Sequence, residues 1–425
     1  MSYPFWDVQI GYGVLMAIIA ILHVFVSHFA IGGGLYLVVA ETFARKKNDE
    51  LMLQFLQKLS KFFLLVTVVF GALSGVGIWF IIGLLNPAGT EVLIHNYVWG
   101  WASEWTFFIM EITAVILYFY GWNRLSAKNH LIIGWIYFIA AWMSLFIING
   151  IITFMLSPGD WLATGNFWDG FFNPTFWSSL WLRTGICIML AGVYALLVAS
   201  REKNLDFKKR LVRSNAIWGL AGLVIMIPTL FWYIDMIPVE LVDAAKESVT
   251  LPVGAMNATF INAALLGITL ILFGLLIPKR YNIVIGVIAM LFALSWFGEY
   301  EFVREAVRKP YVVTNYMYAN GIELAKAETY QNEGLLPSIE FRTGDDGADL
   351  FRRACRSCHT IDGYKALKPH FDGTDETFIA QSIMGTGVMR GNMPPFLGTE
   401  EEAQMIAAHL VPMLASRHLA DIYGL

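Results

Sequence analysis

Eight long apolar runs constrain the fold of this 425-residue chain more than any other feature of its sequence. A helix needs about 20 mostly apolar residues to cross the hydrocarbon core of a bilayer. Runs of this kind lie near residues 10–40, 59–85, 101–121, 131–156, 178–200, 214–234, 257–277 and 281–299. The composition agrees, because only 15% of the residues are charged, against about 25% in an average soluble domain. We therefore predict an all-α protein built on a bundle of about eight transmembrane helices.

Lysine and arginine residues are concentrated in four of the loops between these runs. The loops after the first, third, fifth and seventh runs carry them, whereas those after the second and fourth contain none and the sixth has only Lys246. Because positively charged loops are retained in the cytoplasm, both chain ends are expected on the outer side of a bacterial cytoplasmic membrane. The net charge of -4 gives no indication of a nucleic-acid partner.

The polar C-terminal part contains the sequence CRSCH at residues 355–359. This C-x-x-C-H pattern is typical of covalent haem attachment. Cys355 and Cys358 would form the thioether bonds, and His359 would ligate the iron. Met393, directly before two prolines, is the expected sixth ligand, since a thioether sulfur raises the potential of a haem. The other candidates for that position are Met384, Met389, His370 and His409. A zinc site or a redox-active cysteine pair is the alternative, but a chain with three cysteines has no second cysteine pair.

Ionisable side chains inside the apolar runs are candidate functional residues, because each costs several kcal/mol at bilayer depth unless it has a partner. They are His23, His28, Glu104, Glu111, Arg183, Glu299 and Glu301. His23 and His28 diverge by roughly 140° on a helix and do not readily share one ligand. Glu104 and Glu111 share a helical face, which fits a proton relay or a row of interhelical hydrogen bonds. No other run has an interior histidine, so a haem ligated by two histidines is not expected.

The C-terminal segment 344–425 resembles the class I monohaem cytochromes c. Three stretches carry the resemblance: GADLFRRACRSCHT as the first helix and haem motif, GVMRGNMPPF as the distal loop, and EEAQMIAAHLVPML as the closing helix. The resemblance implies one covalently bound haem c in a small all-α domain.

The apolar region resembles subunit I of the cytochrome bd quinol oxidases. The resemblance is carried by an ordered set of segments that includes ILHVFVSHFAIGGGLYLVVAET, EWTFFIMEITAVILYFYGWNRL and WFGEYEFVREAVRKPY. It implies that His23 ligates one haem of the high-spin pair and that Glu299 or Glu301 ligates the other. It also implies that Glu104 and Glu111 serve the haem environment and proton delivery.

Two features depart from that family. Arg183 stands where the family has the histidine of its low-spin haem, and the long external quinol-binding segment is missing. The fused haem c would then replace the low-spin haem in electron delivery. Arg183 would pair with a haem propionate or with Glu104, or would form a plain interhelical ion pair. His28 has no counterpart as a ligand in the family, so its role stays open.

We expect a membrane haem domain at residues 1–309, a linker at 310–343 and a cytochrome c domain at 344–425. The expected function is respiratory electron transfer between an outer haem c and one or two membrane haems b, as a subunit of a larger redox complex. One alternative is a bd-like terminal oxidase that reduces O2, with haem d as a further option, and another is a structural anchor for a cytochrome c. The expected partners are membrane lipid, other membrane redox subunits, and a c-type cytochrome or a quinol.

Overall fold

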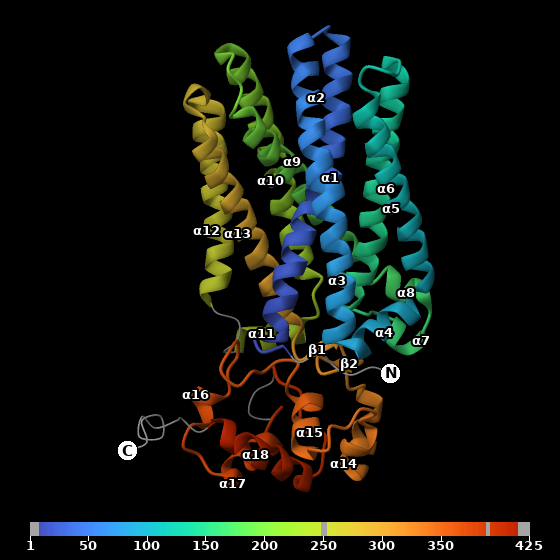
Figure 1. Cartoon of the computed structure of the whole chain (residues 1–425), viewed down its shortest axis with the longest axis vertical. Coiled ribbons are helices and arrows are strands. Elements are labelled where there is room, and N and C mark those ends of the chain that lie inside the picture. Colours follow the sequence, from blue (N-terminus) through green and yellow to red (C-terminus); the bar gives the residue numbers. More distant parts are fainter. Residues whose placement is uncertain (1–7, 248–252, 388–391, 415–425) are drawn as a thin grey trace.

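A bundle of long helices with a smaller helical domain at one end makes up the structure (Figure 1). The computed structural model describes residues 8–247, 253–387 and 392–414. Within this part of the chain, eight helical spans are long and apolar enough to cross a membrane, which confirms the prediction. They are Tyr12–Lys46, Glu50–Leu85, Val98–Gly121, Ala127–Phe154, Phe176–Ala199, Leu205–Asp235, Gly254–Leu276 and Ile283–Arg308.

The spans contain six uninterrupted helices and two that include a π-helical segment. The uninterrupted ones are α1 (Tyr12–Lys46), α5 (Val98–Gly121), α6 (Ala127–Phe154), α9 (Phe176–Ala199), α10 (Leu205–Asp235) and α13 (Ile283–Arg308). The others are α2 (Glu50–Leu64), η1 (Leu65–Gly71) and α3 (Ala72–Leu85), followed by α12 (Val253–Thr269) and η2 (Leu270–Leu276). Short helices in the loops are α4 (Pro87–Asn96), α7 (Trp161–Thr164), α8 (Phe167–Phe171), α11 (Val239–Glu247) and η3 (Pro278–Arg280).

Several helices extend beyond the apolar runs that predicted them, because polar residues cap them outside the hydrocarbon region. The second span begins at Glu50 rather than near residue 59, and the Asp49 carboxylate accepts the N–H of Met52 at 3.1 Å. In the same way, the Asn204 side chain accepts a backbone N–H at the start of α10. Such side-chain caps satisfy backbone donors that a helix end leaves unpaired.

The centre of the bundle is α9, which packs closely against α1 and α10. Glycines make these approaches feasible. A Cβ on Gly32 of α1 would lie 1.8 Å from the carbonyl oxygen of Cys187, and one on Gly222 of α10 would lie 2.2 Å from the nitrogen of Met189. Cys187 is 1% exposed, which fits a small buried core residue.

The C-terminal part begins directly after α13. Its elements are β1 (Tyr311–Val313), β2 (Met317–Tyr318), η4 (Leu324–Lys326), α14 (Ala327–Glu333), η5 (Leu336–Ser338), α15 (Asp346–Ala354), α16 (Lys368–Phe371), α17 (Glu376–Met384) and α18 (Glu400–Leu414). Strands β1 and β2 pair antiparallel. The segment expected as a linker is therefore folded, and Thr314 ties it to the bundle by donating its N–H to the Met155 carbonyl at 3.0 Å.

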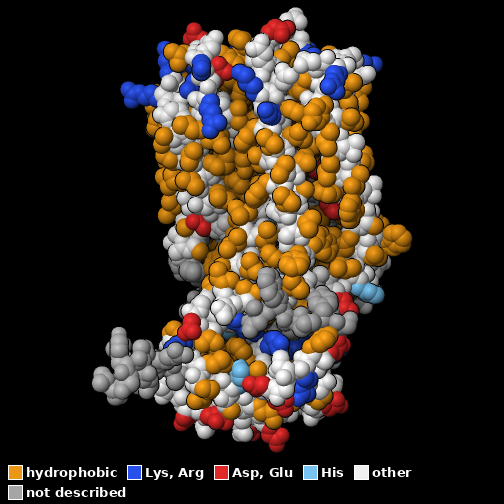
Figure 2. Space-filling model, viewed as in Figure 1, with side chains coloured by type: hydrophobic (Ala, Val, Ile, Leu, Met, Phe, Trp, Pro, Cys, Tyr) orange, Lys and Arg blue, Asp and Glu red, His pale blue; other side chains and the backbone are white. Residues whose placement is uncertain are grey.

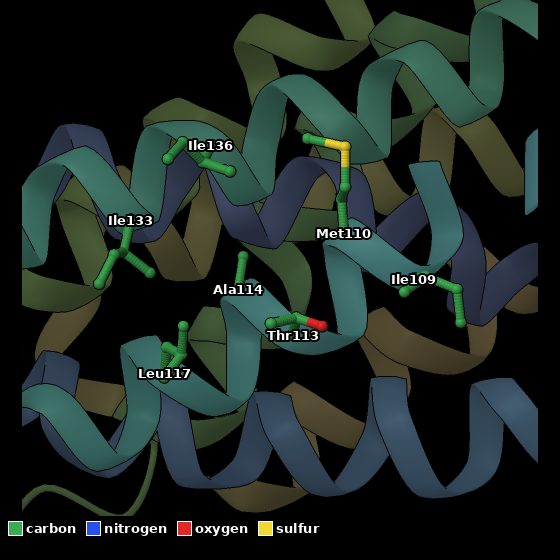
Figure 3. Close-up of a pocket in the computed structure, with 7 residues that line it drawn as sticks. All are labelled: Ile109, Met110, Thr113, Ala114, Leu117, Ile133 and Ile136. Carbon is green, nitrogen blue, oxygen red and sulfur yellow. The ribbon is translucent and has the colours of Figure 1, made fainter. Parts of the chain in front are cut away.

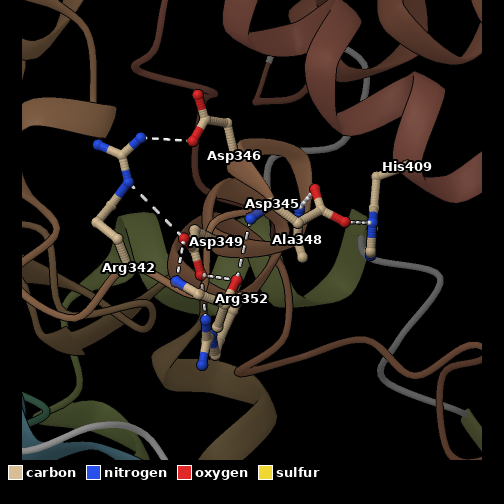
Figure 4. Close-up of polar contacts among 8 residues, drawn as sticks. Arg342, Asp345, Asp346, Ala348, Asp349, Arg352 and His409 are labelled. Atoms are coloured by element: carbon tan, nitrogen blue, oxygen red, sulfur yellow. Dashed lines mark hydrogen bonds and ion pairs between the residues drawn. The ribbon is translucent and has the colours of Figure 1, made fainter.

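Helices α15, α17 and α18 pack around one apolar core that includes Leu350, Ile379 and Ile406. A polar cluster supports the start of α15 (Figure 4). The buried Asp349 carboxylate accepts the backbone N–H and the hydroxyl of Thr343 at 2.8 and 2.9 Å, and it also pairs with Arg352. This cluster fixes the helix that leads into the C-x-x-C-H sequence.

The two ends of the molecule differ in charge (Figure 2). Lysine and arginine side chains gather at the end of the bundle farthest from the C-terminal domain, and acidic side chains are frequent on that domain. We call the first of these the basic end. The predicted orientation, with the basic end in the cytoplasm, rests on this asymmetry.

Candidate functional site

The haem motif follows the end of α15, where the chain turns back within a few residues. The backbone N–H groups of Cys358 and His359 both donate to the Cys355 carbonyl, at 3.1 and 3.0 Å. His359 Nδ1 donates to the carbonyl oxygen of Lys365 at 3.0 Å. This bond leaves the lone pair of the neutral ring on Nε2, as in histidines that ligate metals.

The donor set fits a covalently bound haem. Burial lowers the pKa of His359, which favours the neutral imidazole that a metal ion needs. Burial, and after it the neighbouring Cys358, raises the pKa of the Cys355 thiol to about 12. Two thiols and one imidazole within five residues are the groups that such an attachment requires.

The candidates for the sixth ligand occupy different environments. Met393 is half-buried in the loop before α18. Met384 is 43% exposed and His370 is also exposed. His409 lies on α18 with its Nδ1 3.0 Å from a carboxylate oxygen of Asp345 (Figure 4). Met389 lies outside the described residues. Met393 remains the ligand that we propose.

The haem motif lies against the membrane bundle. The Arg356 guanidinium donates to the carbonyl oxygen of Val8, just before α1, at 3.0 Å. Lys309, directly after α13, interacts electrostatically with Cys358 and pairs with Glu305 at 2.9 Å. The two regions therefore meet at the start of α1, and the haem motif is within electrostatic reach of the end of α13, the helix that carries the late glutamates.

His23 has a hydrogen-bonding pattern that suits a ligand. Its Nδ1 lies 3.1 Å from the Ser74 hydroxyl, which gives its own proton to the Phe70 carbonyl at 2.7 Å, so Nδ1 is the donor. Ser27 lies 3.2 Å from Nε2 and donates to the His23 carbonyl at 2.9 Å. The neutral ring then carries its lone pair on Nε2. Gly75 packs against the ring, since a Cβ there would lie 3.0 Å from His23 Cε1.

His28 is a second imidazole with a free lone pair. Its ring is 2% exposed, and Nδ1 donates to the Val24 carbonyl at 2.7 Å. Its Nε2 is buried and has no hydrogen-bond partner among the residues that the structure describes. Phe297 packs beside it, with ring centroids 5.4 Å apart. Both histidines of α1 are therefore compatible with a haem ligand.

Arg183 forms an interhelical ion pair with Glu301. The arginine is 2% exposed, and its Nη2 lies 3.4 Å from one carboxylate oxygen. Arg304 binds the other oxygen at 2.7 Å. Of the pairings that the sequence left open, the one with Glu104 is wrong, because that residue faces α6. Glu301 thus bonds to two guanidinium groups, whereas Glu299 accepts hydrogen bonds from Asn262 of α12 at 2.9 and 3.1 Å.

Glu104 and Glu111 are brought together by Ser144 of α6. The Ser144 hydroxyl donates to Glu104 at 2.9 Å and also interacts with Glu111. Beside them, an apolar groove of about 220 Å³ runs between α5 and α6 (Figure 3). The groove is lined by Ile109, Met110, Thr113, Ala114, Leu117, Ile133 and Ile136, so the two carboxyl groups do not open into it.

Sequence reasoning missed a buried cluster near the basic end. Glu41 of α1 and His130 of α6 are both 0% exposed, and His130 Nδ1 lies 2.8 Å from the Glu41 carboxylate. Tyr118 of α5 donates to the same carboxylate at 2.7 Å. The sequence did contain a signal for this cluster, because polar residues recur at intervals of seven along α5 and along α6.

Comparisons with known proteins support the two-part organisation. Residues 14–233 match the family model of cytochrome bd terminal oxidase subunit I, and residues 342–410 match that of subunit III of cbb3-type cytochrome c oxidase. A chain of the bd oxidase structure from Geobacillus thermodenitrificans is similar in fold, with a TM-score of 0.62 and 14% identity over 71% of this chain and 87% of that one. No curated protein matches the sequence.

Proposed function

Because this chain belongs to the cytochrome bd terminal oxidase subunit I family, we propose that it passes electrons between an outer haem c and one or two b-type haems in the membrane. Its two matched regions make it a haem-binding, multi-pass membrane protein of respiratory electron transfer. We propose further that it is a subunit of a larger redox complex, with both chain ends on the outer side of the cytoplasmic membrane.

The position of the haem motif against the start of α1 and near the end of α13 is the observation that carries this proposal. The Arg356 side chain bonds to the chain just before α1, and Lys309 interacts electrostatically with Cys358. A haem c held at this position would exchange electrons with the membrane bundle without a separate mobile electron carrier. Haem groups, when bound, supply one-electron chemistry, and the protein residues hold and orient them.

The arrangement inside the bundle supports the same proposal. His23 has its lone pair on Nε2, because Ser74 fixes the hydrogen on Nδ1. Arg183 and Glu301 bond to each other at the position where the family has the histidine of its low-spin haem. The haem c at the outer surface would then deliver electrons in place of that low-spin haem.

A haem count per chain tests the proposal. We expect one haem c and at least one haem b from the pyridine haemochrome spectrum of the purified protein. His23→Ala should remove one haem b and leave haem c unchanged, whereas His95→Ala, at an exposed position of α4, should change neither. An unchanged haem b content in His23→Ala would favour the structural anchor and overturn the proposal.

A second candidate function is reduction of O2 as a terminal oxidase. The observation that favours it is the Ser144 hydroxyl that links Glu104 to Glu111, since plain electron transfer does not require a means of moving protons. The spectrum of the reduced protein with and without carbon monoxide distinguishes the two functions. A shifted band from a membrane haem, of b or d type, indicates an oxidase, and an unchanged spectrum indicates electron transfer alone.

A further inference from the structure

The chain from His359 to Lys365 forms a tight loop directly after the haem-binding cysteines, and we call it the haem loop. Its two ends are joined, because His359 Nδ1 donates to the Lys365 carbonyl at 3.0 Å. Its centre is held by Thr360, which is 1% exposed. The Thr360 hydroxyl donates to the Tyr364 carbonyl at 2.9 Å and accepts the N–H of Gly363 at 2.8 Å. The candidate iron ligand and the rest of the haem loop therefore form one unit.

The haem loop packs against the start of α1, where two glycines make room for it. A Cβ on Gly11 would lie 3.0 Å from the Thr360 side chain. A Cβ on Gly13, one turn into the membrane span, would lie 3.2 Å from the Tyr364 ring. Both distances are shorter than ordinary contacts between side chains, so a larger residue at either position would push the haem loop away from α1.

The Arg356 guanidinium bonds the haem motif to the same part of the bundle. Its Nη2 donates to the Val8 carbonyl at 3.0 Å, and its Nη1 donates to the His359 carbonyl at 3.1 Å. A guanidinium holds its donors in a fixed planar geometry. One side chain thus joins the candidate iron ligand to the start of α1. His23 lies on the same helix, roughly 15 Å from that start.

A second attachment holds the C-terminal domain at a separate place. Arg353 of α15 donates to the Asn320 carbonyl at 2.6 Å, and the Asn320 side chain donates to the Ala354 carbonyl at 3.3 Å. The neighbouring Ala319 carbonyl accepts a hydrogen bond from the Asn86 side chain, directly before α4, at 3.3 Å. Because the two attachments lie on different helices of the bundle, the domain cannot turn about either one alone.

We propose that Arg356 and Tyr364 are positioning residues that dock haem c at the start of α1, and that haem c exchanges electrons with the membrane haem only in this docked state. The inference rests on the proposed function, because it names the contacts on which that transfer depends. In each transfer to the membrane, the iron of haem c is oxidised from ferrous to ferric, and one membrane haem iron is reduced from ferric to ferrous. A domain that moved freely would be competent only for the fraction of time that it spent docked.

The docked position is tested first by a measurement that does not use the haems. Spin labels on the exposed positions Ala163→Cys of α7 and Gln381→Cys of α17 report the distance between the bundle and the C-terminal domain. In the full chain in lipid nanodiscs we expect one narrow distance distribution. Gly13→Leu and Arg356→Gln should each broaden it. Gly254→Leu, in the first turn of α12, is the matched control, because a Cβ there would meet no atom within 4 Å.

The rate of electron transfer is measured on the same variants. A flash-excited ruthenium dye reduces haem c, and the absorbance of the membrane haem follows the transfer. Gly13→Leu should slow it at least about tenfold, because a transfer limited to the docked state slows with the docked fraction. Arg356→Lys should slow it less than Arg356→Gln, since lysine keeps the charge without the fixed fork of donors. Gly254→Leu should leave the rate unchanged.

Haem b and haem c contents of each sample separate a displaced domain from a damaged protein. If Gly13→Leu loses haem b, Arg356→Gln decides the outcome, because it leaves α1 unaltered. A narrow distribution and an unaltered rate in the deciding variant overturn the docked state. A broadened distribution with an unaltered rate overturns the role of docking in the transfer and leaves the proposed function intact. If the unaltered protein has a narrow distribution but its membrane haem is never reduced by haem c, the proposed function is overturned and the docked position stands.

Discussion

The C-terminal domain and the membrane bundle assemble their polar groups in opposite ways. In the domain, three candidate haem-binding groups lie within five consecutive residues, 355–359, and one helix end positions all of them. In the bundle, the Arg183 and Glu301 pair joins residues 118 positions apart, and the Glu41 and His130 contact joins residues 89 positions apart. The haem motif is thus encoded locally, whereas the polar groups of the bundle find their partners only when the helices pack.

The largest expected effect tests whether the two regions are independent. The double substitution Cys355→Ser and Cys358→Ser removes both thiols, so no covalent haem can form, and haem staining on a denaturing gel should be lost completely. Because the membrane histidines lie on α1 and not in the haem motif, the haem b content should stay unchanged. Ser357→Ala, within the same turn, should retain the stain. A simultaneous loss of haem b would show that the bundle depends on the C-terminal domain for its cofactor.

This difference explains which features the sequence allowed us to predict. The eight spans and the C-x-x-C-H motif are short-range patterns, and both fold class and family assignment follow from them. The starts of α2 and α10 were placed too late, because the capping residues Asp49 and Asn204 lie in polar segments that a hydropathy pattern does not register.

The partners inside the bundle were harder to predict. Nothing near Arg183 in the sequence identifies Glu301 rather than Glu104 as its partner, because the choice depends on which helices are neighbours. The contact of Glu41 with His130 was missed for the same reason, since each residue lies near the end of an apolar run and resembles an ordinary residue of a helix end.

The next prediction concerns the long-range pair itself. Arg183→Met removes one partner of a buried ion pair and should lower the free energy of unfolding by about 3–5 kcal/mol, because Glu301 loses one of its two guanidinium contacts inside the bundle. Lys246→Met breaks a pair with Asp243 in which both side chains are more than half exposed. That control should cost less than about 1 kcal/mol. Thermal unfolding followed by tryptophan fluorescence measures both, and equal effects would contradict a structural role for the Arg183 pair.

The smallest expected effect lies at the helix that precedes the haem motif. Asp345 caps α15 by accepting the N–H of Ala348 at 3.0 Å, and its other oxygen contacts His409. Asp345→Ala should therefore lower the stability of the C-terminal domain by about 1 kcal/mol. Loss of the haem c absorbance in guanidinium, measured on the full chain, reports this change, and Asp362→Ala, at a position that is 72% exposed, is the control.

The effect of Asp345→Ala should depend on pH with a definite sign. The Ala348 N–H, and then His409, lower the pKa of Asp345 below its ordinary value of 3.8. A carboxyl whose pKa is lower in the folded state stabilises that state above 3.8, and the contribution disappears as the pH falls through the folded value. The difference in the free energy of unfolding between Asp345→Ala and the unaltered protein should therefore shrink as the pH falls below about 4. If this difference in stability does not change in acid, the charge of Asp345 contributes nothing to the stability of the domain. Because this carboxylate faces water, its removal should cost less than the loss of Arg183 inside the bundle.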